Sequence, residues 1–168
     1  MKQDSSRHFV GRLFAHLTWI TLLGVFYLIF QGRLLQQNDP NHALQVSDNH
    51  QPVVLQRNRQ GHYVAPGTIN GQPVQFLLDT GATDISIPGT LADTLRLTPG
   101  RVSYASTANG TIKVYDTRLD SVALGGLSLA DVSAHINPHM QGETVLLGMS
   151  FLQHLELIQR GDTLTLKR

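Results

Sequence analysis

An uninterrupted apolar run near the N-terminus constrains this chain more than any other feature of its sequence. Residues 13–30 read LFAHLTWITLLGVFYLIF and contain no side chain of fixed charge. The length of the run falls within the roughly 17–25 residues that a helix needs to cross a bilayer. The run is apolar on every face, whereas a helix packed on the surface of a small domain keeps a polar stripe. The sequence therefore predicts a transmembrane helix over residues 13–30 rather than a core helix.

A cleaved signal peptide is the main alternative for this run. The run is long for the apolar part of a signal, and the following GRLLQQNDP lacks the small residues of a cleavage site. Lys2, Arg7 and Arg12 precede the run, whereas only Arg33 follows it closely. Because positive charge stays on the cytoplasmic side, we expect residues 1–12 in the cytoplasm. The chain is then a single-pass protein of the inner, cytoplasmic membrane, with its folded part periplasmic or extracellular.

The next segment, residues 31–60, has a different composition. It is rich in Gln, Asn and His, poor in aromatic residues and without sustained periodicity. Such a segment cannot bury enough apolar surface to fold alone. We expect a flexible linker here, with residues 53–55 as a candidate first strand. The total length of 168 residues leaves room for one domain beyond it, which we place at residues 61–168.

Short strand-like runs separated by turn residues fill this domain. HYVAPGTI and QPVQFLL flank Asn70-Gly71, a dipeptide typical of two-residue hairpin turns. Short helices are expected at residues 90–95 and 149–154. The spacing predicts an all-β barrel or sandwich. The remaining strand-like runs are VSYAS, TIKVYDT, SVAL, VSAHI, TVLL, LELIQ and TLTLK.

Composition excludes several classes of function. The formal net charge is +1 and the basic residues are scattered, so no nucleic-acid-binding face is expected. The chain has no cysteine, which excludes disulfides, thiolate zinc sites and cysteine nucleophiles. His135 and His139 have a spacing seen in zinc sites, but no further ligand motif accompanies them, and solvated histidines are the favoured interpretation. We therefore expect no metal and no cofactor.

The candidate chemistry is concentrated at QFLLDTGATDISIP, residues 75–88. An apolar strand runs directly into Asp79, and a second apolar strand leaves the loop at Ile85. Asp, Thr and Gly are ordinary turn residues, so a D-T-G triplet alone is a weak signal. A carboxylate that directly follows a buried strand is nevertheless costly to desolvate. On the triplet alone, an ordinary turn at Asp79 is the favoured interpretation, and the surrounding sequence has to decide.

The surroundings of this triplet carry a family resemblance. LLDTGAT resembles the active-site loop of pepsin-clan aspartic proteases, in which two apolar residues precede D-[ST]-G-[AS]-[ST]. Leu146-Leu147-Gly148, followed by MSFL, resembles the retropepsin element that packs behind the catalytic loop, and STANG between them resembles the flap. The resemblance covers residues 62–168 and is closest to bacterial, membrane-anchored, retropepsin-like proteins. It implies a closed acid-protease barrel with one lobe per chain.

The resemblance also implies roles for individual residues. Asp79 is the expected catalytic carboxylate, and Thr80, Gly81 and Ala82 support its loop. Thr83 and Asp84 are expected to line the substrate cleft, although a solvated charge is an equally good interpretation of Asp84. The flap is expected at Thr107, Ala108, Asn109 and Gly110, with an ordinary exposed turn as the alternative.

Hydrolysis by this route requires two carboxylates that share one proton, because like charges about 3 Å apart cannot both be ionised. The sequence offers one D-T-G, since Asp93-Thr94, Asp116-Thr117 and Asp162-Thr163 lack the glycine. A homodimer that pairs two copies of Asp79 is therefore expected. Retropepsins commonly bury terminal strands between subunits, so residues 163–166 are expected either at that interface or in the monomer core.

The sequence thus predicts an aspartic endopeptidase that hydrolyses polypeptides through a water activated by two Asp79 carboxylates. The alternative from another class is a module on the same fold that binds peptides or partners without cutting them, because a fold alone does not determine function. The intact loop favours the enzyme, since a buried carboxylate without a function would be a costly feature to keep.

Overall fold

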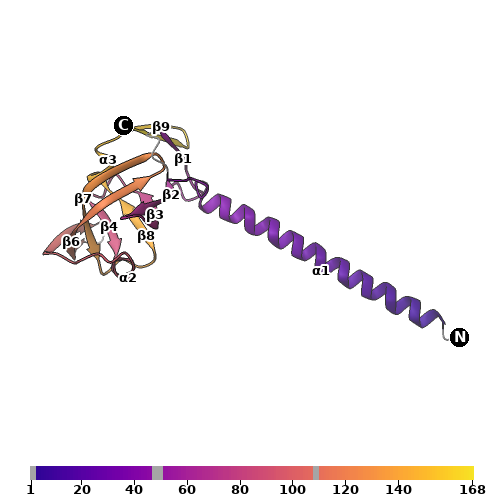
Figure 1. Ribbon diagram of the computed structural model, residues 1–168. Coiled ribbons are helices and arrows are strands. Elements are labelled where there is room, and N and C mark those ends of the chain that lie inside the picture. The colour runs from indigo at the N-terminus through magenta and orange to yellow at the C-terminus, as the bar shows by residue number, and fades with distance from the viewer. Residues whose placement is uncertain (1–2, 47–50, 108–109) are drawn as a thin grey trace. The chain divides into compact units, whose positions relative to one another are not determined.

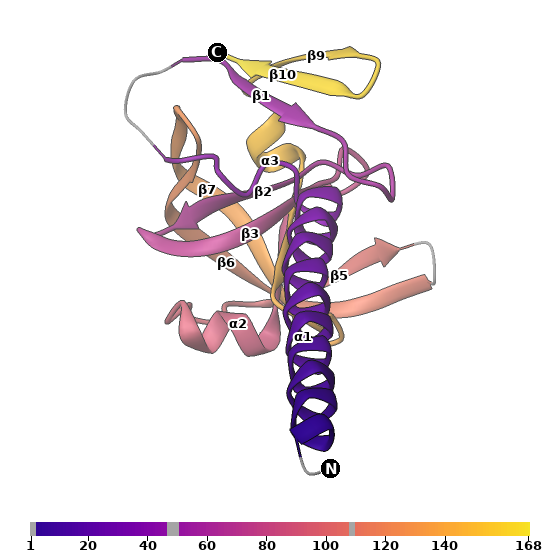
Figure 2. The same ribbon diagram turned by 90° about the vertical axis from the view of Figure 1, so that its right-hand side faces the viewer.

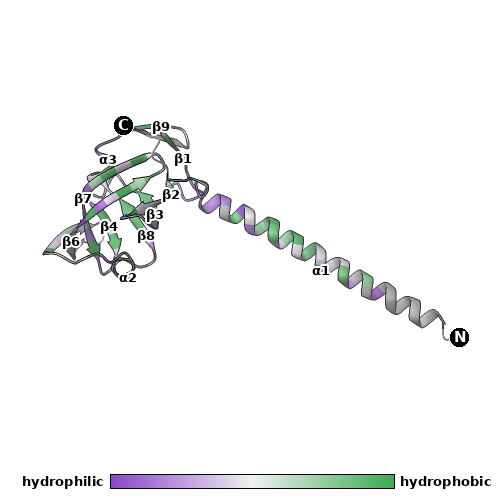
Figure 3. Ribbon diagram, viewed as in Figure 1, coloured by the Kyte–Doolittle hydropathy of each residue, from purple (hydrophilic) through white to green (hydrophobic). Residues whose placement is uncertain are grey.

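The structure is a computed structural model that describes residues 3–46, 51–107 and 110–168. It divides into two compact units, residues 1–37 and 38–168. In the first unit, a single helix α1 (Gln3–Asn38) carries exposed apolar side chains such as Trp19, Phe26 and Leu28. Figure 3 shows mainly hydrophobic residues along its middle. Within the described residues, α1 is the one helix that is long and apolar enough to cross a membrane or to serve as a signal sequence.

The second unit consists mostly of β-strands (Figure 1). Its two short helices, α2 (Gly89–Thr94) and α3 (Met149–Leu152), occupy the two positions expected from the sequence. The strands are β1 (Val53–Gln56), β2 (Val64–Ile69), β3 (Gln72–Leu78), β4 (Ile85–Pro88), β5 (Val102–Thr107), β6 (Gly110–Leu124), β7 (Leu127–Asn137), β8 (Thr144–Leu147), β9 (Glu156–Arg160) and β10 (Thr163–Lys167).

The larger sheet has the strand order β2-β3-β8-β4-β7-β6-β5. An additional pairing of β2 with β6, through Thr68↔Ala123 and Ile69↔Val122, folds this sheet back on itself. The pairing leaves β5 outside the closed part, so the barrel is not strictly closed. The predicted all-β class is confirmed, whereas the predicted closure of the barrel is incomplete.

The β2-β3 hairpin turns at Asn70 and Gly71, whose φ values of 50° and 77° are both positive. Positive φ at both central positions is what a type I′ turn requires, so the predicted hairpin is confirmed. The runs TIKVYDT and SVAL, expected as two strands, are parts of the single strand β6. The residues between them include neither Gly nor Pro, and Leu119 continues the pairing with Val132 on β7.

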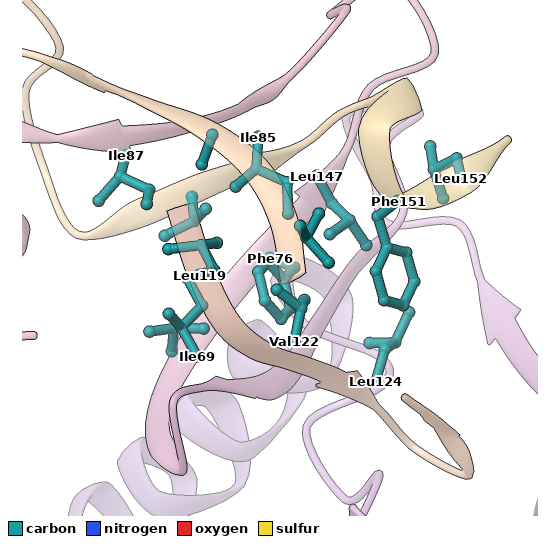
Figure 4. Close-up of a cluster of buried hydrophobic side chains, with 14 of the residues drawn as sticks. Ile69, Phe76, Ile85, Ile87, Leu119, Val122, Leu124, Leu147, Phe151 and Leu152 are labelled. Carbon is teal, nitrogen blue, oxygen red and sulfur yellow. The ribbon is translucent and has the colours of Figure 1, made fainter. Parts of the chain in front are cut away.

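A shared hydrophobic core fixes the strands that lead to the candidate site. Phe76 on β3, Ile85 on β4 and Leu147 on β8 are fully buried and lie close together in Figure 4. Phe151 on α3 is fully buried beside them. Burying one such side chain contributes about 1.5–3 kcal/mol. The loop of residues 79–84 thus connects two strands, β3 and β4, that are both fixed by the core.

Strand β10 is the centre of a separate three-stranded sheet with the order β1-β10-β9. Leu164 and Leu166 on β10 are 6% and 0% exposed. Both edges of β10 therefore pair within the same chain, and its apolar face belongs to the core. Of the two positions expected for residues 163–166, the structure shows the monomer core.

The chain between α1 and β1 is attached to the β domain over part of its length. Asn41 is 8% exposed. Its Nδ2 donates to the carbonyl oxygens of Gln56 and Val64 at 2.9 and 2.7 Å, and its Oδ1 accepts the Gln56 N–H at 2.8 Å. The Gln75 amide donates to Asp39 at 2.8 Å. The expected linker, residues 31–60, thus contains the end of α1, this attachment and β1, and a linker boundary at residue 60 stays a prediction.

These contacts predict that Asn41 stabilises the β domain. Replacing Asn41 by Ala removes three part-buried hydrogen bonds to backbone groups of Gln56 and Val64, so we expect a loss of about 2–3 kcal/mol in the free energy of unfolding. Urea unfolding of the fragment 38–168 measures it. Gln60→Ala, which removes an exposed amide, serves as the control. Equal stability of the two variants would contradict the role of Asn41.

Candidate active site

Asp79 is held by a tight turn at the end of β3. Its backbone N–H donates to the Leu147 carbonyl at 3.2 Å, and its own carbonyl accepts the Ala82 N–H at 3.2 Å. One carboxylate oxygen, Oδ1, accepts the Gly81 N–H at 2.9 Å. The side chain is half-buried. A hydrogen bond from a backbone N–H fixes the orientation of the carboxylate.

The turn is supported from behind by the start of α3. The N–H groups of Met149 and Ser150 donate to the carbonyls of Ala82 and Thr83, both at 2.8 Å. The Ser150 hydroxyl accepts the Ile85 N–H at 3.1 Å. The first N–H groups of a helix have no partner within the helix, so the loop satisfies donors that α3 cannot satisfy itself. Loop and helix therefore form one hydrogen-bonded unit.

Gly148 makes this unit possible because a larger residue would not fit. A Cβ at this position would lie 2.3 Å from the Asp84 carbonyl oxygen and 2.8 Å from that of Ala82. Its φ of −88° is open to any residue, so the requirement is purely one of space. The structure thus places Leu147 and Gly148 behind the loop. Leu146 lines the cavity in front of it.

Asp79 opens into a cavity of about 620 Å³ between the loop and the β5-β6 hairpin, which we call the Asp79 cavity. Of the expected substrate-binding residues, Thr83, Asp84 and Thr107 line it, as do Gly81 and Ala82, which were expected to support the loop. Thr80 is exposed, and neither it nor Gly110 is among the lining residues. Ala108 and Asn109 lie outside the described residues. The other lining residues are Ser86, Ser103, Tyr104, Ala105, Ser106, Ile112, Val114, Asp116, His135, Asn137 and Leu146.

The β5-β6 hairpin projects from the rest of the β domain in Figure 2. Its residues form one wall of the Asp79 cavity. Its strands pair antiparallel up to Thr107 and Gly110. The Thr107 hydroxyl donates to the Gly110 carbonyl at 2.8 Å, and Gly110 has a φ of 113°. Ile112 and Val114 turn their side chains toward the cavity. A Gly-bearing hairpin beside a cleft has the position that a flap requires, and this role is still a proposal.

The cavity wall also contains a row of side chains that the sequence analysis did not place together in the site. Strand register places Leu146 on β8, Ser86 on β4, His135 on β7 and Asp116 on β6 side by side. All four line the cavity. The Ser103 hydroxyl donates to Asp116 Oδ1 at 2.6 Å. The alternation of VSAHIN places His135 and Ile136 on opposite faces of the strand. Only the strand order of the sheet shows which residues neighbour His135.

His135 and His139 differ in their surroundings. His139 is exposed, as expected for a solvated histidine, whereas His135 is half-buried, so that interpretation was wrong for His135. Burial lowers the pKa of His135 below its usual range, and the nearby carboxylates of Asp84 and Asp116 oppose this shift. Among the described residues, no group of three or more acidic or histidine side chains could hold a metal ion.

A second hollow, of about 720 Å³, lies between β7 and α3 and reaches Arg168. It shares Thr83 and Asp84 with the Asp79 cavity but is not lined by Asp79. The candidate carboxylate chemistry therefore belongs to the Asp79 cavity.

Comparisons with known proteins give one matching family and two uncharacterised relatives. A family model described as "gag-polyprotein putative aspartyl protease" matches residues 65–154. A Sinorhizobium protein, described as uncharacterised and located in the cobV 5′ region, is 32% identical over 144 residues. An uncharacterised protein of Rickettsia prowazekii is 28% identical over 107 residues. These matches cover 82% and 62% of this chain but only 62% and 46% of the relatives' lengths.

A solved structure is similar to the same part of the chain. The crystal structure of a retropepsin-like aspartic protease from Rickettsia conorii matches with a TM-score of 0.57 and 27% sequence identity. The match covers 69% of this chain and 89% of the Rickettsia conorii chain.

The contacts of Gly148 predict a strong effect of its smallest substitution. Gly148→Ala forces the loop away from α3, so we expect a loss of more than about 3 kcal/mol in unfolding free energy. Gly71→Ala, in an open turn with a φ of 77°, adds only backbone strain of about 1–2 kcal/mol. Chemical unfolding of both variants provides the comparison. Similar losses for the two would argue against the close packing at Gly148.

The neighbours of His135 predict how its titration responds to mutation. NMR titration of the imidazole should give a pKa below the usual value of a histidine side chain. Asp116→Asn should lower the His135 pKa further, because it removes a carboxylate that stabilises the protonated ring. Asp120→Asn, an exposed substitution on the same strand, should leave it unchanged. An increase in the His135 pKa in Asp116→Asn would refute the proposed electrostatics.

Proposed function

Because this chain belongs to the gag-polyprotein aspartyl protease family and has the retropepsin-like fold, we propose that it is an aspartic endopeptidase active as a homodimer. Each copy supplies one catalytic carboxylate, Asp79. The observation that carries the proposal is the placement of Asp79 on a rigid turn that opens into the Asp79 cavity. The cavity is bounded by a hairpin and is large enough to take side chains of an extended peptide.

The proposed reaction uses a water molecule held between two Asp79 side chains that share one proton. The ionised carboxylate takes a proton from the water, which attacks the peptide carbonyl, while the protonated carboxyl donates a hydrogen bond to the carbonyl oxygen. The leaving amine then takes up a proton as the bond breaks. The Gly81 N–H at 2.9 Å holds Oδ1 in place, so little reorganisation is needed when charge develops.

Two observations favour a partner copy as the source of the second carboxylate. D-T-G occurs once in the sequence. The other carboxylates that line the cavity, Asp84 and Asp116, do not belong to a D-T-G sequence. The exposed Thr80 beside Asp79 is available for contact with a second copy. In the proposed dimer, Thr80 joins the two loops, and Thr83, Asp84 and the hairpin from Thr107 to Gly110 contact the peptide.

We further propose that α1 anchors the protein in the cytoplasmic membrane as a single span. The proposal rests on the length and composition of α1 and on the three basic residues before residue 13. The N-terminus then lies in the cytoplasm and the β domain in the periplasm or outside the cell. Its substrates would be exported polypeptides or segments close to the membrane.

The proposal predicts a specific response to Asp79→Asn. Because amide and carboxylate cannot share a proton as two carboxyl groups do, cleavage of a denatured protein should fall by at least about 1000-fold. Mixing wild-type and Asp79→Asn chains in equal amounts should reduce activity to about half or less, since mixed dimers contain one carboxylate. Peptide release is measured by mass spectrometry at mildly acidic and neutral pH.

Asp120→Asn, an exposed carboxylate on β6, is the matched control and should retain activity. Equal activity of wild-type and Asp79→Asn chains would remove the protease assignment. Peptide binding without cleavage by the wild-type chain would instead favour the non-proteolytic module.

A further inference from the structure

The Asp79 cavity is lined by three carboxylates together with hydroxyl and amide groups that can both donate and accept hydrogen bonds. Besides Asp79, the lining includes the carboxylates of Asp84 and Asp116 and, within the described residues, no Lys or Arg side chain. His135 pairs with Asp116 on β6. The carboxylates of Asp84 and Asp116 both act to raise its pKa, against the effect of burial. A neutral imidazole presents one acceptor nitrogen. Among the described residues, the cavity lining therefore has no Lys or Arg side chain, and it contains several hydrogen-bond acceptors.

Ser86 provides a second, independent observation. Its side chain is buried, with only 3% of the residue exposed, and it lines the cavity beside His135. Its hydroxyl donates to the sulfur of Met140 at 3.8 Å, and no acceptor interaction of its oxygen is present among the described residues. A thioether is a weak acceptor, and buried hydroxyl groups normally have better partners. The Ser86 oxygen can thus accept a hydrogen bond from a ligand in the cavity.

A ligand that suits this wall must offer several donors and a positive charge. Asp84 lies directly before β4, Ser86 is on β4 and Asp116 is on β6. His135 on β7 pairs with both Ser86 and Asp116. An ammonium group has three donors and a guanidinium group has five, and neither has an acceptor. An apolar side chain would leave the same groups desolvated and without partners.

We propose that this wall, formed by Asp84, Ser86, His135 and Asp116, is a specificity subsite that binds a Lys or Arg side chain of the substrate. The inference rests on the proposed protease function and adds to it a preference for polypeptides with a basic residue at one fixed position near the cleaved bond.

The charge of His135 controls how strongly this subsite attracts a cation. Facing it are Asp84, on the segment before β4, and Asp116, on β6, with Asp79 in the same cavity. Arg101 and Arg118 lie with Asp84 and Asp116 around an adjoining hollow, and Arg118 is paired with Asp131. Protonated His135 adds a positive charge to the wall. Selectivity for the basic residue should therefore fall as pH decreases through the pKa of His135.

The experiment uses the full chain in detergent and a peptide series in which each position around one cleaved bond carries either Lys or Met. At one position, Lys should raise kcat/KM over Met by roughly tenfold. Asp116→Asn should reduce this Lys-to-Met ratio by a similar factor. Asp120→Asn should leave the ratio unchanged. Thermal unfolding of each variant verifies that it is folded, and Asp84→Asn provides an independent second test of the wall.

A pH series adds a measurement that a purely structural role would not affect. The Lys-to-Met ratio should rise with pH through the His135 titration in the wild-type chain and lose this step in His135→Gln. His139→Gln is the matched control and should keep the step. Cleavage of all peptides without a Lys preference at any position would overturn the subsite and leave the protease assignment intact. Failure of the wild-type chain to cleave any peptide would overturn both.

Discussion

The packing of Gly148 against the carbonyl groups of Ala82 and Asp84 is the constraint on which the candidate site depends. It brings the backbone of the β8-α3 junction into direct contact with the loop that carries Asp79. The loop itself contains few apolar side chains, so hydrophobic burial alone would not fix it. Instead, β3 and β8 pair in parallel and are fixed by the core. Hydrogen bonds from the first N–H groups of α3 then hold the loop in place.

A rigid turn matters because the proposed chemistry depends on the position of charge. If the Asp79 carboxylate rotated freely, orienting it for the reaction would cost conformational entropy and raise the barrier. The Gly81 N–H on Oδ1 removes much of that freedom before any substrate is present. The opposite wall, the hairpin of β5 and β6, is tied to the remaining sheet mainly through β6. The cavity therefore has a fixed floor and a wall attached along one strand.

The local features of this protein could be predicted from sequence because they depend on neighbouring residues. The Asn70-Gly71 turn, the strand before Asp79 and the two short helices all follow from local patterns. The resemblance to retropepsins predicted the fold. The position of His135 could not be predicted, since its neighbours Ser86 and Asp116 come from strands brought together only by the sheet order. Asn41 was missed for the same reason: its polar side chain looks solvated until Gln56 and Val64 are placed beside it.

The pairing of β10 has a consequence for assembly. Since β1 and β9 occupy both edges of β10 within one chain, the last strand of each copy is complete before a second copy arrives. Association of two such copies requires no exchange of this strand, and separation requires no melting of the sheet. In the proposed protease, each subunit would then fold without its partner, and the local abundance of the protein, rather than its folding, would determine when catalysis begins.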